Sequence, residues 1–196
     1  PYSGHTVMMP LLSVRALGKI PEYVLSNQKE EIHNLLKEGS AGWNEIESYS
    51  IEDWSVSEFN ISPEDDEWIS SISKEITLAY TLTFWDKANH PSGWEGISSR
   101  FQTEEEIQRY LDYVRFIVTH FKDRIHYYEI WNEPDIGYPF QHIEVYDYIN
   151  LTRRAIPVIR EIDPEAKIMV GGVSGFQNPD ARAYLYEILQ SDIMPM

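Results

Sequence analysis

The sequence contains no cysteine, which excludes disulfide bonds and thiolate metal sites. This absence does not decide the compartment, because many secreted enzymes also lack cysteine. The compartment stays unknown, with a secreted or periplasmic location favoured over a cytoplasmic one. Positive charge is scarce as well: 16 Lys and Arg stand against 32 Asp and Glu, a formal net charge of -16. Such a surface repels nucleic acid and anionic membranes, so neither is expected as a partner.

Several sequence patterns are also missing. No apolar run reaches the roughly 18 residues of a membrane helix. No Gly-rich phosphate fingerprint follows the early strands, which argues against a nucleotide-binding doubly wound fold. There is no Gly-x-Ser-x-Gly elbow, so an acyl hydrolase ranks last among the enzyme classes considered. The six histidines form no metal signature, since His126 and His142 lie far apart and no His-x-x-x-His occurs. We therefore expect no metal and no cofactor.

Apolar residues are plentiful enough for one sizeable core. The 196 residues are 42% hydrophobic and 13% aromatic, which suits a single globular domain. Short buried strands alternate with amphipathic helices along the chain, and this order predicts a parallel α/β sheet with right-handed crossovers. Thr103 opens a capping box for the most regular helix, and Pro157 should kink or interrupt a later one. A strand at 6–16 is interrupted by Pro10, which suits a bulge or an edge position.

The remaining elements follow from hydrophobic periodicity and from cap or breaker residues. The expected helices and strands are, in order, helix 26–39, strand 41–49, a helix from 62, strand 76–84, helix 103–121, a strand over 127–133, helix 143–162, strand 167–172, helix 180–189 and the start of a further strand at 192–196.

The stretch Tyr-Tyr-Glu-Ile-Trp-Asn-Glu-Pro-Asp at 127–135 combines an apolar run with an abrupt stop. Pro134 removes a ladder donor and biases the preceding residue toward extended geometry, so the strand should end with Glu133 at its tip. Alternation places Glu129, Trp131 and Glu133 on one face, although the pleat should break near the tip and turn Asn132 toward a pocket. An Asn-Glu pair at a strand end suits proton transfer to a bound sugar or acyl group.

The run Tyr-Glu-Ile-Trp-Asn-Glu-Pro, after a long amphipathic helix, resembles the fourth barrel strand of clan A glycoside hydrolases. The likeness is greatest to the branch with β-xylosidases and α-iduronidases, and it extends from about residue 25 to residue 196. It implies a (β/α)8 TIM barrel that hydrolyses O-glycosidic bonds of a poly- or oligosaccharide with retention. By that resemblance Glu133 is the general acid/base, and Asn132 hydrogen-bonds the sugar's 2-hydroxyl.

A TIM barrel needs about 250 residues, and about five βα units can be placed in this sequence. We therefore expect residues 1–196 to be a partial TIM-barrel catalytic domain in which strands six to eight are absent. The resemblance assigns the nucleophile to strand seven, outside this chain. A substitute among the loop acids is disfavoured, because such acids are usually solvated; these are Glu45, Glu47, Asp53 and Asp86.

An alternative remains open, in which the chain is a truncated, non-catalytic fragment that binds carbohydrate. An open sheet would expose a strand edge and an apolar face, and these would associate with a partner chain or aggregate.

Several aromatic residues are candidates for sugar binding, since a ring suits a face of C–H groups bordered by hydroxyls. Trp85 and Trp54 follow predicted strands, and stacking on sugar and packing in the core are equally compatible with both. Core packing is favoured for Trp131, and Tyr138 is a weaker candidate at the rim of the site. Glu129 is expected to form a buried polar contact inside the barrel.

Overall fold

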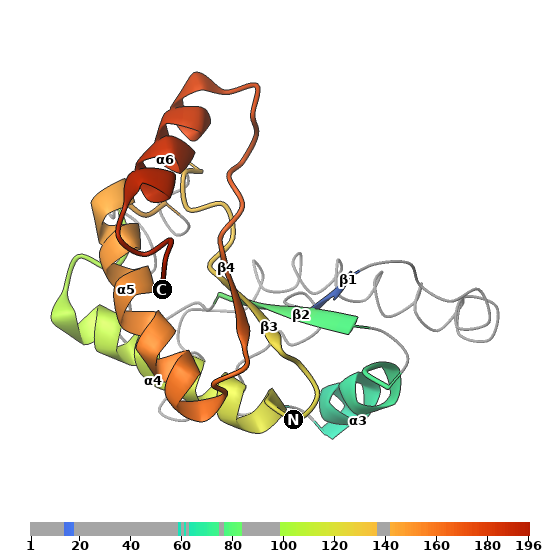
Figure 1. The fold of residues 1–196 in the computed structure, drawn as a ribbon. Helices are drawn as coiled ribbons and strands as arrows, with labels where there is room; N and C mark the ends of the chain where they lie inside the picture. The colour runs from blue at the N-terminus through green and yellow to red at the C-terminus, as the bar shows by residue number, and fades with distance from the viewer. Residues whose placement is uncertain are drawn as a thin grey trace, which may run out of the picture.

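The computed structural model describes residues 14–17, 59, 61, 63–74, 77–83, 99–136 and 142–196. Within them lie three βα units with parallel strands, preceded by a further strand and a further helix (Figure 1). The predicted helix 26–39, the predicted strand 41–49 and the candidate site residues Trp54, Trp85 and Tyr138 lie outside the described residues. The four loop acids considered as substitute nucleophiles also lie outside them.

The sheet has the order β1-β2-β3-β4. Strands β2 (Thr77–Leu82), β3 (Tyr127–Ile130) and β4 (Lys167–Val170) run parallel, as predicted. Strand β1 (Val14–Leu17) lies at the edge and pairs antiparallel with β2, so the expectation of a parallel direction is wrong for this strand. Among the described strands β1 pairs with β2 alone, and the hydrophobic pattern of a four-residue strand carries no information about its direction.

The parallel strands are joined by two long helices. Helix α4 (Glu104–Phe121) connects β2 to β3, and helix α5 (Val145–Ile162) connects β3 to β4. The two helices pack against each other beside the sheet (Figure 1). The apolar stripe predicted for the first of them is buried throughout: Ile107, Tyr110, Leu111, Val114, Ile117, Val118 and Phe121. Helix α3 (Pro63–Ile72) precedes β2, and α6 (Pro179–Gln190) follows β4. This α/β alternation is that of a partial α/β barrel.

Helix α4 begins at the predicted cap. The Thr103 hydroxyl accepts a hydrogen bond from the backbone N–H of Glu106 at 3.2 Å. The Glu106 carboxylate, however, reaches further back along the chain than a capping box requires and accepts from the backbone N–H of Phe101 at 2.6 Å. This glutamate therefore ties the segment before α4 to the start of the helix.

Pro157 does not interrupt α5, which runs unbroken from Val145 to Ile162. The proline lies on the exposed side of the helix, where water can solvate the carbonyl of Arg153 that loses its partner. Tertiary packing of the apolar face, which includes the buried Leu151, Ile156 and Ile159, outweighs the local cost of the proline.

We expect Pro157→Ala to raise the free energy of unfolding by about 1–2 kcal/mol. The alanine restores a helical hydrogen bond, and the gain is reduced because proline also restricts the unfolded chain. Urea denaturation measures the effect, with Glu161→Ala, at an exposed position of the same helix, as the control. A loss of stability in Pro157→Ala would contradict the expectation.

Residues 192–195 form turns after α6, so the expectation that a further strand begins there is wrong. Ile193 packs into the core, and the carboxylate of Asp192 accepts two hydrogen bonds from the Arg153 guanidinium, at 2.6 and 3.0 Å. A short apolar run has the same hydrophobic pattern whether it pairs as a strand or packs against helices.

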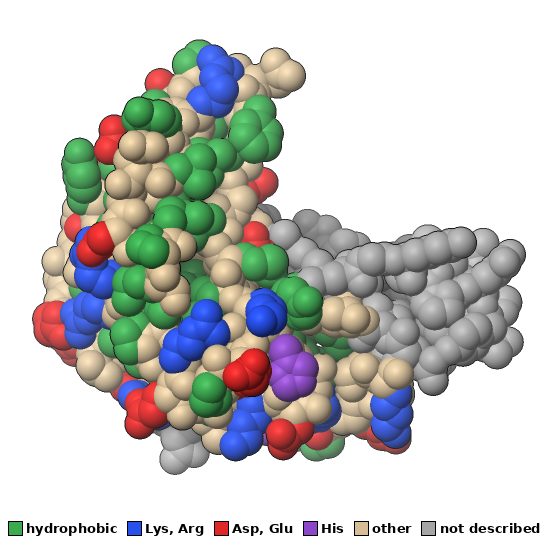
Figure 2. Space-filling view, viewed as in Figure 1, with side chains coloured by type: hydrophobic (Ala, Val, Ile, Leu, Met, Phe, Trp, Pro, Cys, Tyr) green, Lys and Arg blue, Asp and Glu red, His purple; other side chains and the backbone are tan. Residues whose placement is uncertain are grey.

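The surface near the C-terminal helices is partly apolar. Among the described residues β4 is at the sheet edge, and its residues 168–170 are half-buried. In Figure 2 hydrophobic side chains gather over α5 and α6. The large exposed ones are Tyr146, Phe176, Tyr186, Leu189, Met194 and Met196. Association through this edge stays a prediction. None of the described helices has the length and apolarity to cross a membrane.

Candidate functional site

Strand β3 ends at Ile130, opposite Val170, three residues before Glu133. Trp131 and Glu133 both have left-handed backbone conformations, with φ of 66° and 46°, and this breaks the pleat near the tip, as predicted. The expectation that the strand continues to Glu133 is wrong, because these conformations end it at Ile130. The expectation that Glu129, Trp131 and Glu133 share one face is therefore wrong. The Trp131 ring is 3% exposed and meets Phe101 edge to face at 5.2 Å, so it packs in the core, as predicted.

Glu133 lies at the carboxyl end of the parallel strands, beside the end of β4. Its backbone N–H donates to the carbonyl of Gly172 at 2.9 Å, and its carbonyl accepts from the N–H of Ile136 at 3.0 Å. The side chain is half-buried, as is that of its neighbour Asn132. A left-handed conformation is costly for a residue with a side chain and persists only where its surroundings hold it. The chain therefore presents Asn132 and Glu133 in one fixed turn.

The tips of β3 and β4 are joined by side chains once the backbone ladder ends. Tyr148 of α5 donates its hydroxyl to the carbonyl of Ile130 at 2.7 Å and accepts from the N–H of Gly171 at 2.6 Å. Burial raises the pKa of the Tyr148 phenol well above its ordinary value, so this group stays neutral and keeps its proton for the carbonyl. The phenol thereby fixes the spacing of the two strand ends from the helix side.

On the opposite face of the sheet, Glu129 binds the backbone amide of Gly172, the residue after Gly171. The N–H of Gly172 donates to its Oε1 at 3.2 Å, and the hydroxyl of Thr81 on β2 donates to its Oε2 at 2.7 Å. Glu129 is 7% exposed, so the expected buried polar contact is confirmed. Three neighbouring strands meet at this one carboxyl group.

A buried arginine packs beneath the turn. Arg100 is fully buried, and its Nε donates to the Glu106 carboxylate at 2.5 Å. Its guanidinium lies 4.8 Å from the ring centroid of Phe101 and 5.2 Å from that of Trp131. Phe101 also has a left-handed conformation, with φ of 61°. The ion pair between Arg100 and Glu106 thus holds the rings of Phe101 and Trp131 in place, and these two rings anchor the turn at 131–133.

The loops that follow the two strands are also connected. The carboxylate of Asp135 accepts from both the backbone N–H and the hydroxyl of Ser174, at 2.9 and 2.6 Å. Together with the bond from Glu133 to Gly172, this contact makes the loops after β3 and β4 one assembly at the rim of the sheet.

The backbone at Gly171 leaves no room for a Cβ atom. A Cβ at this position would come within 2.9 Å of the carbonyl oxygens of Ile130 and Trp131, which are backbone atoms that cannot move aside independently. We expect Gly171→Ala to lower the free energy of unfolding by about 1–3 kcal/mol, as overpacking does elsewhere. Gly175→Ala is the matched control, because a Cβ there meets no atom within 4 Å. Equal urea midpoints for the two variants would contradict the close approach.

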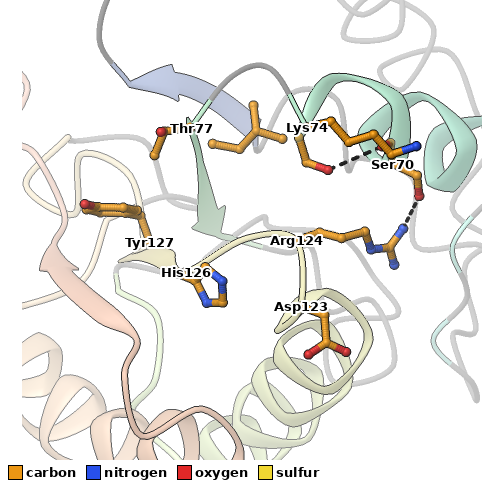
Figure 3. A pocket seen from close by; sticks show the side chains of 9 residues that line it. Ser70, Lys74, Thr77, Asp123, Arg124, His126 and Tyr127 are labelled. Carbon is orange, nitrogen blue, oxygen red and sulfur yellow. Dashed lines mark hydrogen bonds between the residues drawn. The ribbon is translucent and has the colours of Figure 1, made fainter.

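A pocket of about 570 Å³ lies at the other end of the strands (Figure 3). It is bounded by the starts of β2 and β3, with Lys74, Thr77, Arg124 and Tyr127 among its lining residues. Arg124 is engaged there with Asp66 and Ser70. In barrels this end serves stability and the opposite end carries chemistry, so the pocket is not the predicted sugar site. In the part of the chain that the structure describes, no group of three or more His, Asp or Glu side chains is placed to hold a metal.

Sequence reasoning identified Asn132 and Glu133 but missed the residues that hold them. Gly171 and Gly172 follow an apolar strand, and a Gly-Gly pair there signals a close backbone approach. Thr81, Tyr148 and Arg100 carried no comparable signal, because each lies at least 15 residues from Glu133 in the chain.

A scan against protein families matches residues 54–192 to the family model described as Cellulase (glycosyl hydrolase family 5). A solved structure of a family 39 glycoside hydrolase from the gut symbiont Bacteroides cellulosilyticus WH2 is similar, at 20% sequence identity and a TM-score of 0.47. The similarity covers 59% of this chain and 23% of that one. No curated protein matches the sequence. Glycosyl hydrolase family 5 belongs to clan A, the clan that the residues around Glu133 indicated.

Proposed function

This chain belongs to glycosyl hydrolase family 5, and from that premise we propose that it is part of an enzyme that hydrolyses O-glycosidic bonds of a poly- or oligosaccharide with retention of configuration. The observation that carries the proposal is the turn Trp131–Asn132–Glu133 at the carboxyl ends of the parallel strands, in which Trp131 and Glu133 have left-handed conformations. Backbone strain of this kind is concentrated at functional sites. A net charge of -16 suits a neutral glycan better than an anionic one.

In the proposed reaction Glu133 acts first as a general acid and then as a general base. It protonates the glycosidic oxygen as the bond to the leaving group breaks, and it later removes a proton from the water that releases the sugar. Asn132, adjacent to it, donates a hydrogen bond to the 2-hydroxyl. Retention needs a second carboxyl group about 5–5.5 Å away as the nucleophile. We place that group outside residues 1–196, on the strand that the clan resemblance assigns to it.

The test is hydrolysis of a panel of aryl glycosides by the full-length chain, with the first-formed anomer read by proton NMR. Derivatives of cello-oligosaccharides and xylo-oligosaccharides head the panel, because the matching model is that of cellulases and the Glu133 motif resembles the β-xylosidase branch. The expected first product has the anomeric configuration of the substrate. An inverted product would refute the retaining mechanism. Glycan binding without hydrolysis would favour the non-catalytic fragment instead.

A further inference from the structure

Glu129 binds both neighbours of its strand through one buried carboxyl group. Its two oxygens accept from the hydroxyl of Thr81 on β2 and from the backbone N–H of Gly172 beyond β4. A buried glutamate is rarely retained without partners, because desolvation of the group is costly. This arrangement spans three strands at the end of the sheet where the candidate site lies.

The same glycine makes the contact with Glu133. The Gly172 N–H donates to Glu129, and the Gly172 carbonyl accepts from the N–H of Glu133 at 2.9 Å. Gly172 thus connects Glu129 with Glu133. These two glutamates are four residues apart in the chain, on either side of the break in the pleat. Any displacement of Gly172 moves the acceptor that fixes the backbone of Glu133.

Glu133 depends on that acceptor. Its φ of 46° is in the left-handed region, which is unfavourable for a residue with a side chain and persists only where neighbouring contacts enforce it. Among the described residues, the backbone of Glu133 makes hydrogen bonds to Gly172 and to Ile136, and the second of these lies within its own loop. Of these two bonds, the one to Gly172 ties Glu133 to the neighbouring strand.

We propose that Glu129 is a positioning residue, which holds Glu133 in its reactive orientation through Gly172 and with Thr81 as its support. The proposal rests on the proposed function for its catalytic consequence. Its geometric content, that Glu129 controls the backbone of residue 133, can be tested without any activity.

Two substitutions at residue 129 separate the hydrogen-bonding geometry of the side chain from its charge. Glutamine at residue 129 keeps an oxygen for the Gly172 N–H and can donate to a rotated Thr81 hydroxyl, so Glu129→Gln retains the geometry. Leucine keeps the volume and offers no acceptor. Tyr128→Phe is the matched control: it deletes a buried hydrogen bond from the same strand, to the carbonyl of Ile125 at 2.8 Å, at the end far from Glu133.

The first measurement is amide hydrogen exchange of Gly172 and Glu133 in the three variants. We expect Glu129→Leu to speed exchange of both amides by about tenfold, the equivalent of one lost hydrogen bond. Glu129→Gln and Tyr128→Phe should leave them within about threefold of the original protein. Unchanged exchange in Glu129→Leu would overturn the proposal whatever the enzyme's activity. If the leucine variant does not fold, Thr81→Val replaces it and should show the same pattern at smaller amplitude.

The second measurement is the leaving-group dependence of hydrolysis by the full-length chain. A displaced acid matters most where the leaving group needs protonation, so in single-turnover kinetics Glu129→Leu should slow cleavage of a phenyl glycoside about 100-fold and that of a dinitrophenyl glycoside far less. Equal losses on both substrates, or the same loss in Tyr128→Phe, would mean a structural role only. If the loss in Glu133→Gln did not depend on the leaving group, the acid/base assignment itself would be refuted. Failure of the positioning proposal and failure of the proposed function can therefore be told apart.

Discussion

Glu133→Gln in the full-length chain should lower kcat/KM on a phenyl glycoside by about 10²–10⁴-fold. General acid/base catalysis contributes about this much, which corresponds to about 2.7–5.4 kcal/mol of transition-state stabilisation. Glutamine preserves the size of the side chain and its hydrogen-bonding capacity but cannot deliver a proton to the glycosidic oxygen. The backbone bonds of residue 133 to Gly172 and Ile136 do not involve the side chain, so the fold should be unaffected.

Substrates with activated leaving groups should be spared at the first step. A dinitrophenolate departs without protonation, so the bond to it should break at nearly the original rate in the Glu133→Gln variant, and slow release of the sugar should then limit turnover. A burst of dinitrophenolate in stopped-flow absorbance would show this. Glu161→Gln, the same change at an exposed helix position, is the control for the charge removed. Similar losses on phenyl and dinitrophenyl glycosides in single-turnover kinetics would count against the assignment.

Glu106→Ala should lower the free energy of unfolding by about 3–5 kcal/mol, the range found when one partner of a buried ion pair is removed. Arg100 is fully buried, and its Nε–H donates to this carboxylate. The substitution also removes the acceptor for the N–H of Phe101, at 2.6 Å. The arginine charge would remain in the core with less compensation, while the left-handed turn at Phe101 loses one of its restraints.

Urea denaturation followed by tryptophan fluorescence measures this loss, since Trp131 packs against the guanidinium at 5.2 Å. Glu105→Ala is the matched control, because its side chain is exposed in the same first turn of α4; it should change stability by less than about 0.5 kcal/mol. Glu106→Gln, which keeps two polar atoms at the site, should fall between the two variants. A loss below about 1 kcal/mol in Glu106→Ala would show that other contacts compensate the buried arginine.

The parts of the fold that were predictable share one property: their signals are local. The buried stripe of α4, the cap at Thr103 and the start of β3 at Tyr127 are all encoded within a few residues. Burial of Trp131 was also foreseen. The errors arose where a distant contact decides the outcome. Pro157 is accommodated because the opposite face of α5 is packed, and 192–195 turns instead of extending because Ile193 enters the core.

The sequence by itself determined the class of the protein and the identity of the candidate residues. Alternating helical and strand periodicity is sufficient for an α/β sheet, and the Trp-Asn-Glu-Pro motif at 131–134 is sufficient to select Asn132 and Glu133. Only the tertiary structure decided how those residues are held. The backbone N–H of Glu133 in its left-handed turn donates to the carbonyl of Gly172, and Trp131 packs against Arg100 and Phe101. Such contacts join residues that are remote in the chain, and their energies depend on distance and burial, which no local pattern of residue types records.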